Sequence, residues 1–275
     1  MKKRTLIVIV VLILLTSSAA FASGKVGQSA PEIFISKWFT ANPPQIKNTT
    51  GRVYLLEFWA TWCHSCVTSI PGLNKLHDKY APQGLEIIGL SQDHADGTLA
   101  KFMKTKDIHY SIAIDNGTVD LCDITGYPTS ILVDHTGQIV WRGHPWSWGL
   151  EGKIKKALAK APPPHLAGIN LGSFKHLEKK LASMKSFFDA YKTIEATTIT
   201  EDPDTAKTAK LIIAGINANI QRQINIADLL CKTSPKKARK LYADIIEKFG
   251  KLSLTKPVIV SYQNMKTIGS VANSG

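Results

Sequence analysis

One short stretch constrains the fold of this chain more than any other: an apolar strand that leads into two cysteines and then into a helix. Val53–Trp59 is a continuous apolar run with one carboxylate, Glu57, inside it, which is typical of a strand buried on both faces. Cys63 and Cys66 follow, and apolar residues then recur at helical spacing as far as Tyr80. A Cys-x-x-Cys pair where a strand meets a helix predicts a redox site.

The positions of the two cysteines suit different roles. At the first turn of the helix, backbone N–H groups and the positive end of the helix dipole point at the sulfur of Cys63 and favour its thiolate. Cys66 lies on the same side of that turn, where it can attack a mixed disulfide formed by Cys63. We therefore predict that Cys63 attacks and Cys66 resolves. A structural zinc site needs about four Cys or His ligands. The sequence offers no second pair at such spacing, so no metal is expected.

Glu57 is costly in an otherwise apolar strand unless it has a partner or a role. Burial would raise the pKa of its carboxyl group. Our hypothesis is that Glu57 exchanges a proton with Cys66 as that thiol enters or leaves the disulfide. The alternative is a position at the sheet edge, with the carboxylate in water.

Strand and helix patterns alternate through the first half of the chain and end in a hairpin. This order predicts an α/β fold, a central mixed sheet with helices on both faces. Residues 23–50 are loop-rich, with one short apolar piece at 33–35. Beyond the first strand and helix, strands are expected at 85–90, 109–114, 130–133 and 138–142, and helices near 99–103, 119–123 and 150–161.

A proline-rich segment divides the chain. Ala161-Pro162-Pro163-Pro164-His165 predicts a stiff extended linker. Domains are therefore expected at residues 23–161 and 171–275, with residues 162–170 as the linker. The second domain has only helical patterns, and its apolar stripes favour a small bundle that serves partner binding or self-association. Helices are expected over 174–191, 204–230 and 235–249, with a weaker one after Pro257.

The first residues have the pattern of a secretory signal. Residues 1–22 combine a basic start, an apolar run from Leu6 to Leu15, and an Ala20-Phe21-Ala22 exit, which predicts a signal peptide cleaved before Ser23. The apolar run is shorter than the ~20 residues of a membrane-spanning helix, and an uncleaved anchor is the alternative. We therefore expect export to a bacterial periplasm, where disulfide chemistry is permitted, and an exported or membrane-bound redox partner.

The net charge is +13, and residues 165–275 contribute +8 of it, from 17 basic and 9 acidic residues. A solvated lysine-rich surface explains this bias, and an acidic partner or an anionic membrane surface is the sharper alternative. The sequence contains no phosphate loop and no nucleic-acid motif. No nucleic-acid partner is expected.

Wider motifs add a family resemblance. Phe58-Trp59-Ala60-Thr61-Trp62 precedes the cysteines, Pro71 follows them, and Gly126-Tyr127-Pro128-Thr129 leads into a Leu-Val-Asp-x-x-Gly hairpin. With the element order and the export signal, these motifs resemble the thioredoxin superfamily over about residues 25–160. They are most similar to the exported TlpA/ResA-type thiol-disulfide oxidoreductases. The resemblance implies a thioredoxin-like fold and disulfide exchange with protein thiols, without a cofactor beyond the redox-active disulfide.

The resemblance also implies roles for single residues. Cys63 and Cys66 correspond to the nucleophilic and the resolving cysteine of the family. Trp62 corresponds to the aromatic residue beside them, Pro128 to the cis-proline and Glu57 to the buried acidic residue. The peptide group of Tyr127 is expected to pair with the substrate backbone. Many TlpA-type proteins have asparagine at the position of the buried acidic residue.

The chain departs from the family at two further places. The family often has a proline between its cysteines, and here the pair is His64-Ser65. A protonated His64 would stabilise the thiolate and make the couple more oxidising, whereas a solvent-facing His64 would not. Cytochrome-maturation members often carry a charged stretch with glutamate after the second cysteine. Here Val67-Thr68-Ser69 stand there, which argues against a dedicated cytochrome c role. The direction, reductase or oxidase, stays open.

Cys122 and Cys231 complete the four cysteines of the chain. A disulfide between them would join the two domains, and two separately buried thiols are the alternative. Two other functions compete with disulfide exchange. A peroxidase is disfavoured because no Thr-x-x-Cys motif is present. A non-catalytic binding or chaperone-like module is disfavoured by the intact Cys63, Cys66 and Pro128.

Overall fold

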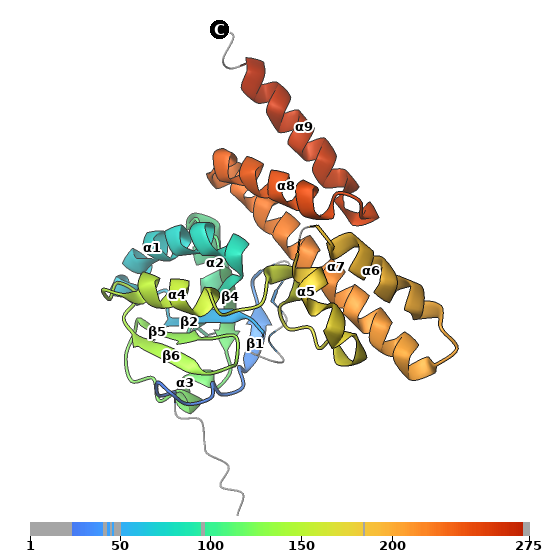
Figure 1. The fold of residues 1–275 in the computed structure, drawn as a ribbon. Helices are drawn as coiled ribbons and strands as arrows, with labels where there is room; N and C mark the ends of the chain where they lie inside the picture. Colours follow the sequence, from blue (N-terminus) through green and yellow to red (C-terminus); the bar gives the residue numbers. More distant parts are fainter. Residues whose placement is uncertain are drawn as a thin grey trace, which may run out of the picture.

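The computed structural model describes residues 24–40, 43–44, 46, 51–94, 97–183 and 185–271. The predicted signal peptide and its cleavage site lie outside these ranges. Within them, no helix is both long and apolar enough to cross a membrane. A sheet unit, from β1 to α4, is followed by a helical unit, from η2 to α9 (Figure 1).

The sheet unit is built on six strands in the order β1-β4-β3-β2-β5-β6. The central strand β2 pairs in parallel with β3 and antiparallel with β5. β4 continues the parallel part, while β1 and β6 are antiparallel edges. The predicted mixed sheet is confirmed, and β1 is a strand that the sequence analysis did not identify. The strands are β1 (Ile35–Trp38), β2 (Val53–Trp59), β3 (Leu85–Ser91), β4 (Ser111–Asp115), β5 (Thr129–Val133) and β6 (Ile139–Gly143).

Alternate residues of β2 face two apolar layers. Val53, Leu55 and Trp59 belong to the layer that α1, α2 and α4 cover. Leu56 and Phe58 belong to the layer on the other face, where the short α3 packs (Figure 1). All seven residues of β2 are buried, as expected for a strand covered on both faces. The helices of this unit are α1 (His64–Tyr80), η1 (Ala81–Gln83), α2 (Thr98–Thr105), α3 (Thr118–Leu121) and α4 (Leu150–Leu158).

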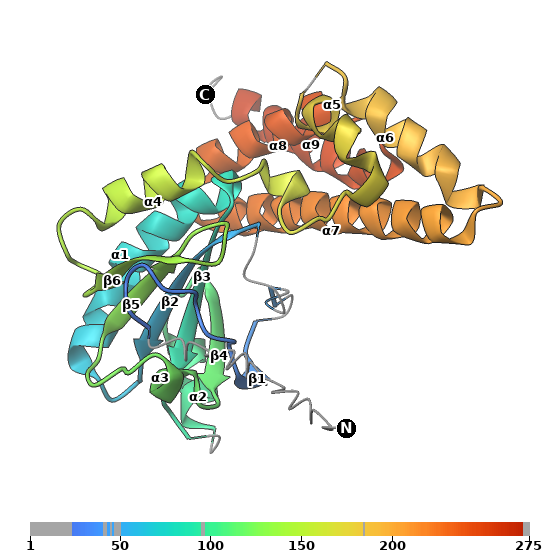
Figure 2. The same cartoon turned by 60° about the horizontal axis from the view of Figure 1, so that its bottom comes forward.

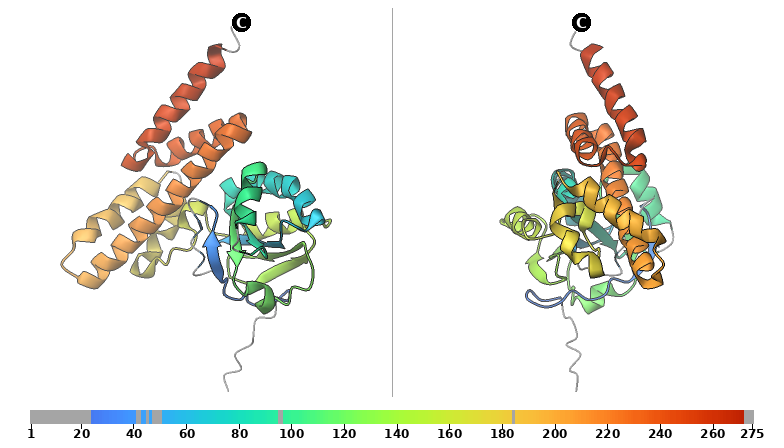
Figure 3. Two further views of the ribbon diagram at one scale, coloured as in Figure 1. Left: turned by 180° about the vertical axis from the view of Figure 1, so that it is seen from behind. Right: turned by 45° about the vertical axis from the view of Figure 1, so that its right-hand side comes forward.

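The helical unit has one apolar cluster of its own, to which its successive helices contribute. The long helix α7 lies beside α6 and α8, and α9 projects away from the sheet unit (Figure 3). The predicted helices at 204–230 and 235–249 are confirmed. The elements are η2 (Pro164–Leu166), η3 (Gly172–Leu177), α5 (Glu178–Ala182), α6 (Phe187–Ala196), η4 (Thr197–Ile199), α7 (Pro203–Thr233), α8 (Pro235–Phe249), η5 (Ser253–Thr255) and α9 (Lys256–Val271).

The single helix predicted over 174–191 is wrong. Three elements, η3, α5 and α6, occupy this stretch. Ser183 ends α5 with an extended backbone, at φ −88° and ψ 131°. The Ser186 hydroxyl donates to the carbonyl of Lys180 at 3.1 Å. Serine side chains that bond to nearby backbone groups compete with the helical pattern, and an apolar stripe does not reveal this.

The stiff extended linker predicted at residues 161–165 is extended at Pro163, with φ −53° and ψ 144°, but not beyond it. Pro164–Leu166 forms a turn of 3-10 helix, and Leu166 is buried in the core of the helical unit. Asn219 of α7 donates to the carbonyls of His165 at 3.3 Å and Ala167 at 2.9 Å. These bonds to α7 fix the backbone of the segment, which composition alone could not indicate.

The helical unit packs against the end of the sheet at which β2 begins. Arg222 of α7 forms an ion pair with Glu86 at the start of β3, and Arg52 donates to Asn219. A Cβ on Gly51 would collide with the backbone of Gly168, so the chain needs glycine there. Figure 2 shows one end of α7 near the end of α1, while the rest of α7 extends away from the sheet unit.

No disulfide joins Cys122 to Cys231, so the hypothesis of a covalent link between the units is wrong. Cys122 is fully buried in the sheet unit. Cys231 lies in the helical unit, where its sulfur is 3.4 Å from the hydroxyl oxygen of Tyr242. The packing of each cysteine into the core of a different unit separates the two sulfurs.

Candidate active site

Cys63 lies between β2 and α1 and forms the N-cap of the helix. The backbone N–H of Cys66 donates to the Cys63 sulfur at 3.3 Å. The two sulfurs are 2.07 Å apart and form a disulfide. A donor at a helix N-terminus stabilises a thiolate more than a thiol. When the disulfide opens, negative charge is therefore better stabilised on Cys63.

The two cysteines differ in their accessibility. The exposed fraction is 8% for Cys63 and 1% for Cys66. Cys66 packs between α1 and the sheet, in the same apolar layer as Ile70 and Leu73. A reacting group from outside the protein therefore meets Cys63 first.

Of the two residues between the cysteines, Ser65 is close to the sulfur. Its hydroxyl oxygen is 3.4 Å from the Cys63 sulfur, from where it can donate to a thiolate. His64 is exposed, and among the described residues no hydrogen bond joins its ring to that sulfur. The geometry therefore favours Ser65 over His64 as the residue that adjusts the thiolate.

A buried carboxylate that the sequence analysis missed, Asp93, fixes the loop before Cys63. It accepts from the backbone N–H of Thr61 at 2.9 Å and from the Thr61 hydroxyl at 2.6 Å. The Ser91 hydroxyl donates to the same carboxylate at 2.6 Å. The signal available in the sequence was an acidic residue just after a buried strand. The carboxyl ends of parallel strands meet at one edge of a sheet, and here that edge is where β2 also ends.

The predicted substrate-binding residues lie at this same end of the sheet. The Tyr127–Pro128 peptide bond is cis, as the resemblance implies. β5 begins just after it, with Thr129 opposite Phe58 at the end of β2. The rings of Tyr127 and Trp62 meet edge-on with their centroids 5.9 Å apart. Tyr127 and Trp62 therefore lie beside the disulfide as neighbours.

Glu57 lies on the central strand and is 1% exposed, so the alternative of an edge position is wrong. The Ser130 hydroxyl donates to one carboxyl oxygen, and the other is buried with no hydrogen-bond partner among the described residues. Burial raises the pKa of Glu57 to about 8, and the hydrogen bond from Ser130 opposes this only in part. Near neutral pH this carboxyl group therefore carries a proton.

Glu57 has a small residue beside it on each adjacent strand. It pairs with Gly89 of β3 on one side and with Ser130 of β5 on the other. The period of two along β2 places it on the face of the sheet that α1 covers. Cys66 and Tyr110 belong to the same layer, and the pKa of Tyr110 is raised by burial and then by the charge of Glu57. Glu57 and Cys66 thus lie in one layer, between the sheet and α1.

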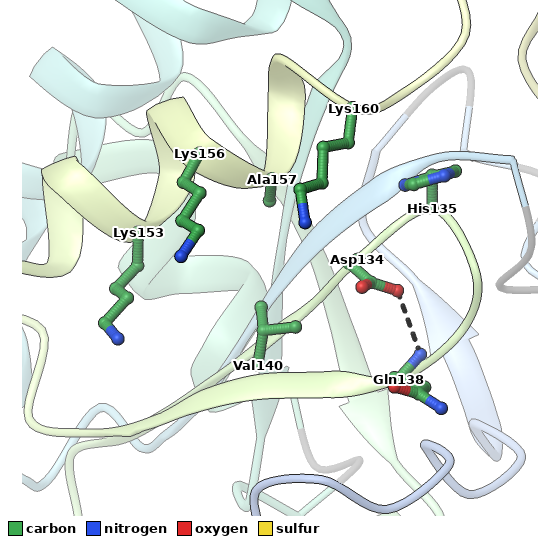
Figure 4. A pocket seen from close by; sticks show the side chains of 8 residues that line it. All are labelled: Asp134, His135, Gln138, Val140, Lys153, Lys156, Ala157 and Lys160. Carbon is green, nitrogen blue, oxygen red and sulfur yellow. Dashed lines mark hydrogen bonds between the residues drawn. The ribbon is translucent and has the colours of Figure 1, made fainter.

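A hollow of about 310 Å³ lies away from this site. Figure 4 shows three lysines that point toward it, Lys153, Lys156 and Lys160, opposite the turn between β5 and β6. That turn is at the far end of β5 from Pro128, so the hollow takes no part in the redox site. Across the described residues, no group of three or more His, Cys, Asp or Glu side chains is placed to hold a metal ion.

Known proteins share the sheet unit. The model of the AhpC/TSA family matches residues 26–142. The thiol-disulfide oxidoreductase ResA of Bacillus cereus is 32% identical over 136 residues, which are 48% of this chain and 78% of that protein. The chain belongs to the ResA-like thiol-disulfide oxidoreductases of the thioredoxin superfamily. The ResA-like Cys-x-x-Cys motif is the disulfide Cys63–Cys66 described above.

Other known proteins also match part of the chain. The thioredoxin-like protein YneN of Bacillus subtilis is 30% identical over 117 residues, 41% of this chain and 68% of that protein. A solved thiol-disulfide isomerase from Corynebacterium glutamicum is 21% identical, with a TM-score of 0.43, and covers 48% of this chain and 98% of its own. The family model ends at residue 142, so the helical unit is an addition to the part that it describes.

Proposed function

We propose that this protein exchanges disulfides with the thiols of other proteins, through Cys63 and Cys66, outside the cytoplasm. The observation that carries the proposal is the disulfide at the N-terminus of α1, with Cys63 as the more exposed of the two cysteines. Since the electrons are carried by the disulfide itself, the exchange needs no further cofactor. Tyr127, Pro128 and Trp62 hold the substrate chain against Cys63.

In the reductive direction the reaction has two steps. The Cys63 thiolate attacks one sulfur of a substrate disulfide; a Cys63–substrate disulfide forms, and the other substrate sulfur leaves as a thiolate that takes up a proton. Cys66 then loses its proton and attacks the Cys63 sulfur, which releases the second substrate thiol. The Cys63–Cys66 disulfide is formed, and two electrons have passed to the substrate. In the oxidative direction every step is reversed.

Glu57 handles the proton of Cys66 in this scheme. With a pKa of about 8, it is close enough in acidity to a thiol, whose ordinary pKa is about 8.5, for a proton to pass either way. Its unpartnered oxygen is the atom available for that transfer. A mixed disulfide trapped on Cys63 should therefore be resolved more slowly in Glu57→Gln, with a changed pH profile. An unchanged profile would remove this role.

Reduction of insulin tests the function. Wild-type protein with dithiothreitol should reduce insulin faster than dithiothreitol alone, and Cys63→Ser should abolish the difference. Cys231→Ser is the matched control, because it also replaces a thiol by a hydroxyl but lies in the helical unit. No acceleration by the wild type, or an equal rate in Cys63→Ser, would support a non-catalytic binding module instead. A Cys66→Ala variant, which retains the mixed disulfide, then allows substrates to be identified by mass spectrometry.

The direction of the exchange and the export of the protein can each be measured separately. The reduction potential decides the direction: a value below about −200 mV supports a reductase, and one near about −120 mV an oxidase. N-terminal sequencing of the mature protein decides export: a chain that begins at Ser23 supports a cleaved signal peptide, and one that begins at Met1 contradicts it. We also propose that the helical unit binds a partner or a second copy of the chain.

A further inference from the structure

Two tryptophans near the redox site are exposed without a role in the chemistry described above. The exposed fraction is 53% for Trp146 and 102% for Trp148, beside 67% for Trp62 at the disulfide. Holding an apolar ring in water is unfavourable, and tryptophan is enriched where proteins bind one another. Trp146 and Trp148 lie on the loop of residues 144–149 between β6 and α4.

This loop leaves the sheet at the redox end. β6 ends at Gly143, which pairs with Ser130 just after Pro128. The Trp146 ring then reaches α1, where its nitrogen would be 4.0 Å from a Cβ on Gly72. Gly72 follows Cys63 by nine residues, which is roughly 13 Å along the helix axis. An extended polypeptide spans that distance in about four residues.

Hydrogen bonds fix the shape of the loop. The backbone N–H of Trp146 donates to the His144 ring at 3.3 Å, and that of Ser147 donates to the His144 carbonyl at 2.8 Å. The rings of His144 and Trp146 also pack, with centroids 5.0 Å apart. Gly149, with φ 92°, turns the chain into α4 directly after Trp148. The loop is therefore already ordered for binding, which lowers the cost of association.

The surface around the two rings suits an apolar occupant. A hollow of about 290 Å³ is lined by Leu76, Pro145, Trp146, Ser147, Trp148, Gly149, Leu150 and Glu151. Glu151 is its one ionisable group, and Lys79 holds that carboxylate at 2.7 Å. With this charge compensated, neither a basic nor an acidic segment is favoured over an apolar one.

We propose that Trp146 and Trp148 bind an apolar segment of the substrate protein, about four residues from the cysteine that reacts with Cys63. This inference rests on the proposed function and names the class of substrate. The disulfide and the two rings lie along one helix, so the occupant is an extended or unfolded chain rather than a folded surface. The loop thus sets the preference among substrates, while Cys63 and Cys66 perform the exchange.

Peptides that differ in one feature test the proposal. Each carries a single cysteine as a mixed disulfide with thionitrobenzoate. One has a Leu-Phe pair about four residues from that cysteine, before or after it, and the other has Ser-Ser there. Single-turnover reactions of the reduced protein give a limiting rate and a half-saturation concentration for each peptide. The variants are Trp148→Ala and Trp146→Ala/Trp148→Ala, with Leu211→Ala as control because Leu211 is 66% exposed on α7.

For the wild type and Leu211→Ala, we expect the half-saturation concentration to be about tenfold lower with the apolar peptide than with the Ser-Ser peptide. The limiting rates should be similar for the two peptides. The double variant should lose this preference, and Trp148→Ala should lose part of it. Rates with the small disulfide of thionitrobenzoate should be unchanged in all of them, which shows that each variant is folded and active. A preference that persists in the double variant would overturn the proposal. A wild type that treats both peptides alike would also overturn it. So would sedimentation that shows the wild type to be a dimer held together by the two tryptophans.

Different results would contradict the proposed redox function and the proposed docking role. If the wild type reacts with the small disulfide but treats both peptides alike, the docking role is contradicted and the redox function stands. If it reacts with neither peptide nor small disulfide, the redox function itself is contradicted, and the docking role with it.

Discussion

Glu57 places an ionisable group in the middle of the sheet, between two small residues, Gly89 and Ser130. The group is kept neutral near pH 7 because burial disfavours its charged form. Burial of this carboxyl group therefore lowers the stability of the protein at high pH.

The substitution Glu57→Gln should reveal this loss. Between the ordinary pKa of 4.5 and the folded value of about 8, the folded protein holds a proton that the unfolded chain has released. The free energy of unfolding of the wild type should therefore fall as pH rises through this window, by up to about 1.4 kcal/mol per pH unit. Glu57→Gln should remove that contribution.

Urea unfolding of the disulfide-bonded protein across this pH window measures the effect. Glu247→Gln is the control, because Glu247 is an exposed carboxylate on α8, and it should keep the slope of the wild type. If Glu57→Gln and wild type show the same slope, Glu57 does not titrate as a buried group.

Single residues were predictable where their chemistry or spacing is unusual. Cys63, Cys66 and Pro128 stand in a motif, and Glu57 interrupts an apolar strand. Ser130 was not predictable, and Asp93 offered only its place after a buried strand, because their partners are 73 and 32 residues away in the chain. An ordinary serine or aspartate gains its role only when strand pairing brings it to the site.

At the scale of elements, the contact between β2 and β3 depends on Gly89. A Cβ there would lie 2.5 Å from Ile112 and 2.9 Å from the ring nitrogen of Trp59. Trp59 and Ile112 belong to the apolar layer beneath α1. Gly89 therefore leaves space for the Trp59 side chain of β2 to pack against the sheet.

Two glycine-to-alanine substitutions should have opposite effects. Gly89→Ala overpacks the layer and should lower the free energy of unfolding by about 1–3 kcal/mol. Gly152→Ala lies in α4, where nothing is within 4 Å of the added Cβ, and should raise it by about 0.5–1 kcal/mol, because alanine favours a helix. Chemical denaturation of both variants decides the matter. If Gly89→Ala leaves the free energy of unfolding unchanged, the apolar layer has room for the added methyl group.

Elements were predictable where a periodic pattern coincides with clear end signals. The helix after the cysteines was predicted to extend as far as Tyr80, and α1 ends at that residue. The pattern at 174–191 was equally periodic but is broken at Ser183 and Ser186. Periodicity reports which face is buried, and it does not report whether the backbone is continuous.

At the scale of the whole molecule, the two units are joined by polar contacts that are largely buried. The Arg222–Glu86 pair has side chains that are 24% and 9% exposed, and Ser111 donates to the same carboxylate at 3.3 Å. Arg52 adds its bond to Asn219. The pKa of Arg52 is lowered, first by burial and then by the charge of Arg222. The contact between the units therefore depends on Glu86 to balance two arginines.

Arg222→Ala should weaken this contact. It leaves the Glu86 carboxylate buried without its cation and should cost about 3 kcal/mol. Lys210→Ala, an exposed position on the same helix, should change little.

The six tryptophans all lie between residues 38 and 148, so their fluorescence reports on the sheet unit, while far-UV circular dichroism reports mainly on the helices. In Arg222→Ala the two unfolding midpoints should separate. Coincident midpoints at wild-type stability would contradict the coupling.

The seven residues of β2 also separate two ends of the molecule by roughly 20 Å. The helical unit occupies the end where the strand begins, and the disulfide lies at the end where it stops. A protein bound to the helices, as proposed above, would therefore leave the disulfide uncovered. The redox site and the helical unit lie at opposite ends of β2, so substitutions on the outer faces of the helices should leave disulfide exchange unchanged.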